Sequence, residues 1–144
     1  MSTVANAYRE TQVLTASPER LHLMVIDAAI RFARQAMAAM EKNDIEGGFH
    51  ALNRSRDCVN EMLTGIATDP NPGLADRLRG LFVFVLQNLA RADLLRDPQL
   101  IRDALAILET HRQTWLKLIE KVQAAQPDRS TVEEFGVSER SWSG

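Results

Sequence analysis

Four stretches of the chain repeat apolar residues every three or four positions, the spacing of helices that bury at least one face. The first runs from about Pro18 to Lys42 and carries two apolar stripes, so we expect neighbours on more than one side of it. The second, from Asp44 to about Ala67, is strongly amphipathic. The third, from about Leu74 to Leu95, is apolar all round in its middle, which predicts a helix buried on several sides.

The fourth stretch runs from Pro98 to about Ala125 and ends before Pro127. Its start is marked by Asp97, which can cap the helix, followed by a proline at the first helical position. Ser17 can likewise cap the first helix and is followed by Pro18, and Asp44 can cap the second. Four helices of about 20 to 28 residues with short connections predict an all-α, antiparallel four-helix bundle, a rod of roughly 30 to 40 Å.

The predicted organisation has three parts. Residues 18–125 form the bundle, and residues 1–17 form an N-terminal arm that carries the apolar side chains of Tyr8, Val13 and Leu14. Residues 126–144 contain only four sizeable apolar residues, which are scattered among polar ones, so we expect a disordered tail. The length of 144 residues suits a single domain.

Composition narrows the classes of partner. The net charge of −2 provides no basic excess for phosphates, which argues against nucleic acid. The longest apolar runs, such as "LFVFVL" at 81–86, are far shorter than the roughly 20 residues of a membrane span. The N-terminus shows no signal-peptide pattern. Cys58 is the single cysteine, which excludes an internal disulfide and fits a cytoplasmic location.

Catalytic motifs are missing from the sequence, so we expect no enzyme, metal or cofactor. A di-iron bundle needs two Glu-x-x-His pairs, and the chain has one, Glu19 and His22. One bundle chemistry needs only a single exposed histidine, namely phosphotransfer. "FHALNRS" at 49–55 is a faint match to that pattern around His50, but Asn53 and Arg54 replace its lysine and glycine.

Two polar positions have open interpretations. Asp27 interrupts an apolar stretch, so it either faces water or pairs with a base such as Arg31 at i+4. Cys58 is interpreted as a small packed side chain and not as a reactive thiol.

Residues 7–37, "AYRETQVLTASPERLHLMVIDAAIRFARQAM", resemble the flagellar secretion chaperone family, FliS, whose pattern includes Thr-Ala-Ser-Pro and an Asp at the place of Asp27. Three later blocks are also similar and follow in the family's order: 44–63, 81–97, and "LETHRQTW" at 108–115. The resemblance covers about residues 5 to 122. Departures include Phe82 and Phe84 in place of tyrosines, and Gln87 with Asn88 in place of an Arg-rich pair.

The resemblance implies a helical bundle and a concrete function. Such chaperones bind the disordered C-terminal segment of flagellin in the cytoplasm, prevent premature polymerisation, and deliver the subunit to the flagellar type III export gate. A regulator of flagellin that competes for the chaperone is left open. The rival interpretations are a generic helical adaptor for another amphipathic partner and the phosphotransfer bundle.

The residues expected to meet the partner fall into two groups. Tyr8, Val13 and Leu14 form a cap that shields a groove until the client arrives; the alternative is an arm docked permanently on the bundle. The predicted groove residues are Leu52, Val59, Val85, Asn88, Leu89 and Ala92, with Arg112 and Trp115 at a rim. Because empty apolar grooves can self-associate, the expected state is a monomer or a weak homodimer.

Overall fold

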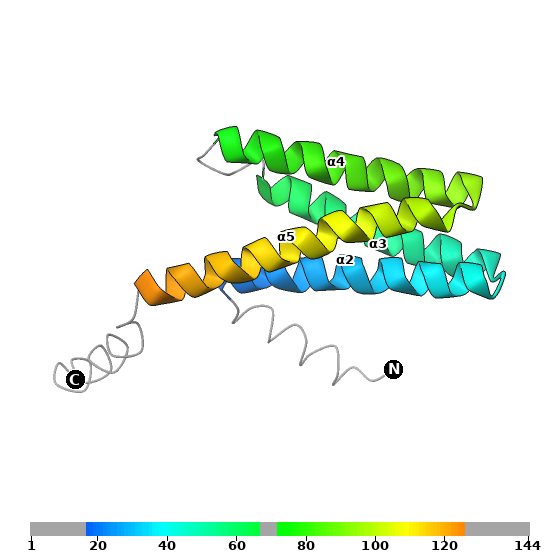
Figure 1. The fold of residues 1–144 in the computed structure, drawn as a ribbon, viewed down its shortest axis with the longest axis horizontal. Coiled ribbons are helices and arrows are strands. Elements are labelled where there is room, and N and C mark those ends of the chain that lie inside the picture. Colours follow the sequence, from blue (N-terminus) through cyan, green and yellow to red (C-terminus); the bar gives the residue numbers. More distant parts are fainter. Residues whose placement is uncertain (1–16, 67–71, 126–144) are drawn as a thin grey trace, which may run out of the picture.

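A computed structural model describes residues 17–66 and 72–125 of the chain. Within these ranges it contains four helices, α2 (Pro18–Glu41), α3 (Ile45–Ile66), α4 (Pro72–Leu95) and α5 (Pro98–Ala125). The contacts run from α2 to α3, from α3 to α4, from α4 to α5, and from α5 back to α2, so each helix packs against two others (Figure 1). The predicted all-α four-helix bundle is confirmed.

Local chemistry explains where the helices begin. The Ser17 side chain accepts a hydrogen bond from the backbone N–H of Arg20, and Pro18 follows at the first helical position. The Asp44 carboxylate accepts from the N–H of Gly47 at 2.9 Å, and that of Asp97 accepts from the N–H of Gln99 at 2.9 Å. All three predicted caps are therefore confirmed.

The core fills the centre of the ring of helices. Every helix contributes large side chains to it with at most 2% of their surface exposed, including Ile26, Leu52, Met62, Phe82, Leu89, Ile101 and Leu108. Burial of such a side chain stabilises the fold by about 1.5 to 3 kcal/mol. Small residues allow α2 to approach its neighbours closely, because Ala29, Ala33 and Ala36 are fully buried.

The two ends of the bundle differ. At one end, short turns join α2 to α3 and α4 to α5, and each contains a residue with positive φ, Asn43 at 57° and Arg96 at 54°. At the other end, α4 diverges from α2 and α5, and α5 extends beyond them (Figure 1). The short turns hold the helices of each pair together at one end, whereas at the other end α4 lies farther from α2 and α5.

None of the described helices is long and apolar enough to cross a membrane.

Candidate functional site

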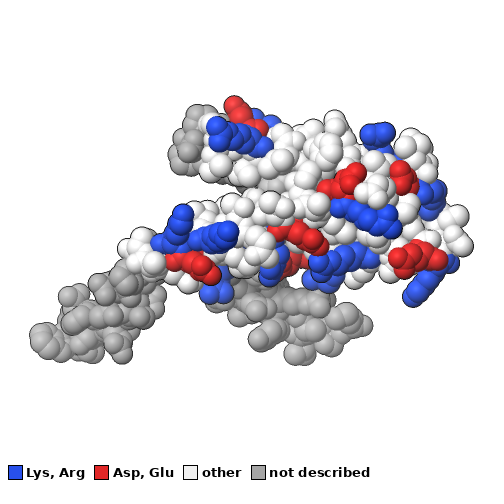
Figure 2. All heavy atoms as spheres, viewed as in Figure 1, with Lys and Arg blue, Asp and Glu red and all other residues white. Residues whose placement is uncertain are grey.

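The outer face of α4 is apolar and open to solvent. Leu81, Val83 and Phe84 are 44%, 38% and 45% exposed. No charged residue occurs between Gly80 and Ala90. Figure 2 shows the middle of α4, at the top of the view, without charged side chains on the face in view, while charges gather toward its two ends. We call the exposed side chains of Leu81, Val83 and Phe84 the α4 face.

The α4 face corrects one expectation from the sequence. Its apolar middle predicted a helix buried on several sides, but among the residues that the structure describes α4 packs mainly against α3 and α5. Three further large apolar side chains of this helix are also exposed: Leu74, Leu94 and Leu95. An apolar surface of this extent on a single chain is typical of a site that binds another protein.

A groove lies at the divergent end of the bundle, with a volume of about 480 Å³. We call it the open-end groove. Its lining combines the first turns of α2 with the last turns of α3, one residue of α4 and one of α5: Pro18, Glu19, Leu21, His22, Val25, Glu61, Met62, Gly65, Ile66, Leu78 and Trp115. The groove is mainly apolar with two carboxylates, so it can receive apolar side chains of another segment.

Trp115 fixes the edge of this groove. Its indole Nε1–H donates to the backbone carbonyl of Glu19 at 2.8 Å, and its ring packs on the His22 imidazole with centroids 4.2 Å apart. The hydrogen bond satisfies a half-buried donor and ties α5 to the first turn of α2. Trp115, predicted as a rim residue, therefore lines the groove and also holds two helices together.

Behind Trp115, two histidines from α2 and α5 face each other. The Nε2 atoms of His22 and His111 are 2.9 Å apart, so one imidazole donates its N–H to the bare nitrogen of the other. His111 is buried, and the edge of Phe82 packs against it. Burial lowers the pKa of His111 to about 4, with a further contribution from the charge of His22, and burial also lowers the pKa of His22. Both rings are therefore neutral at pH 7.

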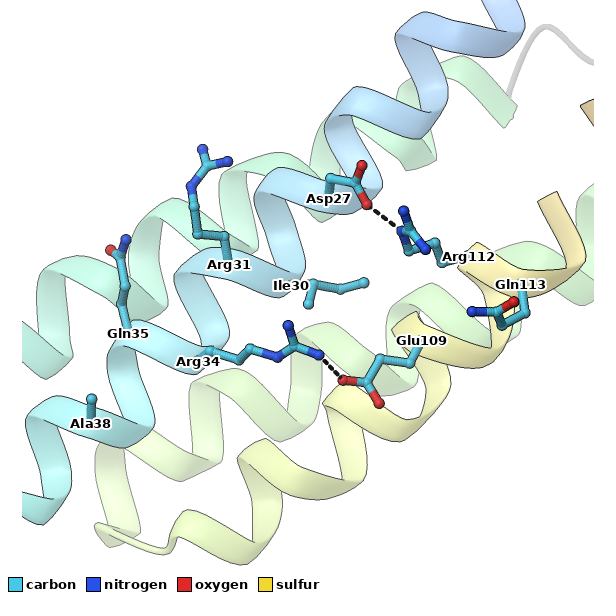
Figure 3. A pocket seen from close by; sticks show the side chains of 9 residues that line it. All are labelled: Asp27, Ile30, Arg31, Arg34, Gln35, Ala38, Glu109, Arg112 and Gln113. Atoms are coloured by element: carbon cyan, nitrogen blue, oxygen red, sulfur yellow. Dashed lines mark hydrogen bonds and ion pairs between the residues drawn. The ribbon is translucent and has the colours of Figure 1, made fainter. Parts of the chain in front are cut away.

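Two ion pairs join α2 to α5 farther along (Figure 3). The Arg112 guanidinium donates to the Asp27 carboxylate at 2.5 Å, and Arg34 donates to Glu109 at 2.6 Å. Ile30 lies between the two pairs (Figure 3). We call these two ion pairs, together with the His22–His111 pair and the Trp115 hydrogen bond, the α2–α5 clamp.

The clamp resolves the open question of Asp27. Its partner is Arg112, 85 residues away in sequence, and not Arg31 at i+4. Arg31 instead lies over the Phe32 ring, 5.0 Å from the centroid. Arg112, predicted at the rim of a client groove, is thus engaged within the bundle, and Asp27 and Arg112 from the two quoted sequence blocks form a structural contact.

The remaining predicted groove residues lie in the core. Leu52, Val59, Val85, Leu89 and Ala92 are at most 1% exposed, and Asn88 is 4% exposed. They offer no surface to a partner while the helices are packed in this way. Tyr8, Val13 and Leu14 lie outside the described residues. Sequence reasoning missed Leu81, Val83 and Phe84, although the uncharged stretch around them was the available signal.

The other candidates for chemistry are isolated. His50 is exposed and lies 3.7 Å from Glu46 on the same helix. Cys58 is half-buried, and burial together with the Glu61 charge raises the pKa of its thiol, which disfavours the reactive thiolate. Within residues 17–66 and 72–125, no three His, Cys, Asp or Glu side chains gather in an arrangement that can hold a metal ion.

Comparison with known proteins identifies the family. Proteins named flagellar secretion chaperone FliS from Vibrio cholerae, Bacillus subtilis and Salmonella typhimurium are 24%, 23% and 25% identical to the chain over 106, 114 and 113 residues. These alignments cover 74%, 79% and 78% of this chain, and 78%, 84% and 84% of the relatives. The family model described as flagellar protein FliS matches residues 1–122, and the chain therefore belongs to the FliS family.

Proposed function

We propose that this protein is a cytoplasmic export chaperone that binds the C-terminal segment of flagellin. In this role it keeps flagellin from polymerising early and delivers it to the flagellar type III export apparatus. Membership of the FliS family and the names of the relatives support a chaperone of flagellar secretion. Binding, without a chemical step, is the activity that this proposal requires.

The observation that carries the proposal is the α4 face. α4 carries no charge between residues 80 and 90, and its side chains Leu81, Val83 and Phe84 are exposed to water. This exposure is unfavourable relative to burial against another apolar surface. An amphipathic client helix laid along α4 covers these side chains and gains the corresponding burial. The same client face would otherwise contact other flagellin subunits, so binding here blocks polymerisation.

The open-end groove supplies a second contact for an extended client. It lies beside Leu78 of α4, so a segment that leaves the α4 face at its N-terminal end can continue into the groove. Order imposed on a disordered client costs several kcal/mol, and two separate apolar surfaces help to offset that cost.

The N-terminal arm fits the same scheme. We propose that residues 1–16, with Tyr8, Val13 and Leu14, cover an apolar groove in the empty chaperone and leave when the client binds. The described chain begins at Ser17, and the next two residues already line the open-end groove. Deletion of residues 1–16 is expected to accelerate client binding; a chain that merely becomes less stable would point to a permanently docked arm.

The decisive experiment is calorimetric titration of the full chain with a peptide of the last ~40 residues of flagellin from the same organism. We expect saturable one-to-one binding with a strongly negative heat-capacity change, the mark of apolar burial. The double variant Leu81→Ser/Phe84→Ser is expected to bind at least about tenfold more weakly, since each side chain contributes about 1 kcal/mol or more. Ile45→Ser, an exposed apolar residue on α3, is the matched control.

The outcomes separate the alternatives. Wild-type affinity in the double variant would remove the α4 face from the binding site. No heat and no co-elution with flagellin at high micromolar concentration would exclude flagellin as the client and favour a helical adaptor for another partner.

A further inference from the structure

One row of residues along α4 follows a seven-residue repeat, and all but one of its members are exposed. Steps of three and four residues lead from the first turn of the helix to its end through Leu74, Arg77, Leu81, Phe84, Asn88, Arg91 and Leu95. We call this row the α4 seam. Its members are exposed except for Asn88, which the bundle covers. Alternation of three and four residues is the spacing by which two helices pack along a shared seam.

Two arginines interrupt the apolar residues of the seam. Arg77 and Arg91 are exposed, and neither forms an ion pair with any residue that the structure describes. Arg79 provides a contrast, because it points to the opposite side of the helix and pairs with Asp76 at 2.9 Å. The two seam arginines are separated by two repeats, which is about 21 Å along the helix axis.

This placement disfavours a second copy of the same chain as the occupant. If two seams pair in antiparallel fashion about Phe84, Arg77 of one copy meets Arg91 of the other. If they pair in parallel, each arginine meets its own counterpart. Both arrangements bring like charges together on an otherwise apolar strip, which penalises self-association while leaving an oppositely charged partner unaffected.

We propose that the α4 seam selects a client helix with two carboxylates spaced two heptads apart, flanking an apolar stretch. Arg77 and Arg91 each face one carboxylate, and Leu81 and Phe84 pack on the apolar stretch between them. This inference rests on the proposed chaperone function and specifies the chemistry of the segment it binds. The charges fix the register of the client along α4, and the apolar residues supply most of the affinity.

Charge reversal on the seam tests the proposal. Binding of the flagellin C-terminal peptide to Arg77→Glu/Arg91→Glu is expected to weaken about tenfold at ~50 mM salt and much less at ~500 mM, where exposed charges are screened. Arg79→Glu reverses one charge on the same helix away from the seam, so it is the matched control for the single variants Arg77→Glu and Arg91→Glu. It should bind nearly as the wild type does, whereas each single seam variant should bind more weakly. Both altered arginines are exposed, and circular dichroism checks that the fold persists.

A compensating change in the client makes the test specific. A flagellin peptide with lysines in place of the two carboxylates is expected to bind the reversed variant better than the wild type. If Arg77→Glu/Arg91→Glu and Arg79→Glu bind the flagellin peptide equally well at low salt, the seam does not select the client by its charge. The proposal is then overturned, although the chaperone function stands.

Failure of the chaperone proposal itself has a different signature. If the wild type binds no flagellin peptide, a designed helical peptide with leucines at its a and d positions and two glutamates fourteen residues apart is titrated instead. Preference of the wild type for this peptide over its lysine counterpart supports the seam. Binding of neither, or equal binding of both, overturns it.

Discussion

The His22–His111 pair predicts that the bundle loses stability in mild acid. An ordinary histidine has a pKa of 6.5, and burial lowers the pKa of His111 to about 4. Between these pH values His111 is protonated in the unfolded chain but stays neutral in the folded chain. The free energy of unfolding therefore falls as the pH falls. The contribution is fully present above pH 6.5 and is lost at about pH 4.

The magnitude follows from the two pKa values. Each pKa unit corresponds to about 1.4 kcal/mol, so His111 alone accounts for roughly 3 kcal/mol between pH 6.5 and 4. The pKa of His22 is lowered as well, which adds to the effect in the same direction. Burial is the main cause, because the charged imidazolium loses its water in the core, and the Nε2 atoms only 2.9 Å apart let a charge on either ring oppose a proton on the other. For a single domain, such a loss is a large part of the total stability.

Urea unfolding followed by circular dichroism at several pH values between 7.5 and 4 measures this loss. In His111→Gln the amide keeps a polar group near the position of Nε2 but takes up no proton, so the dependence on pH should become clearly shallower. His50→Gln, which removes an exposed histidine, is the control and should retain the wild-type slope. Parallel loss of stability in the wild type and His111→Gln would refute the explanation.

Three further substitutions test the local structure. Gly80→Ala is expected to raise the free energy of unfolding by about 0.5 to 1 kcal/mol, because no atom lies within 4 Å of the added Cβ; Gly47→Ala should gain less, since its Cβ would lie 2.2 Å from the Asp44 carboxylate that caps the helix. Trp115→Phe removes the hydrogen bond to the Glu19 carbonyl and should lower the free energy of unfolding by about 1 kcal/mol. Thermal or urea unfolding measures all three, and an unchanged stability of Trp115→Phe would argue against its role in holding α2 to α5.

The helices could be predicted from the sequence because their signals are local. Ser17, Asp44 and Asp97 cap helices through hydrogen bonds that reach only two or three residues ahead. Apolar periodicity within each segment then identifies the buried side. These features do not depend on which helix becomes the neighbour, so a single sequence suffices for them.

The site could not be predicted in the same way, because its contacts join distant parts of the chain. His22 meets His111 across 89 residues, and Asp27 meets Arg112 across 85. Leu52 and Val85 were interpreted as groove residues, but the packing of the ring places both in the core. Apolar periodicity predicts that a side chain is buried. It does not predict whether the side chain is buried inside its own fold or against another protein.

α4 is the clearest case of this ambiguity, and it connects the fold to the proposed function. Its middle has the composition of a buried helix, yet within the described residues its main contacts are with α3 and α5, and Leu81, Val83 and Phe84 stay exposed. A partner helix on the α4 face would complete the burial that the sequence pattern predicts. Under the proposed function, this departure from the sequence expectation marks the place where the client binds.

The α2–α5 clamp holds one edge of the open-end groove, which Trp115 and His22 line. Its contacts at Glu19 and His22 join the first turns of α2 to α5 near the divergent end, and its two ion pairs continue the connection farther along α2. Changes in the clamp should thus lower stability and, by loosening the open-end groove, client affinity together. Changes on the α4 face should lower affinity alone, because Leu81 and Phe84 contribute little to the core while exposed. The free energy of unfolding and the affinity for the client should both be measured for Trp115→Phe and for Leu81→Ser/Phe84→Ser. Together they distinguish the α4 face, which binds the client, from the α2–α5 clamp, which stabilises the bundle.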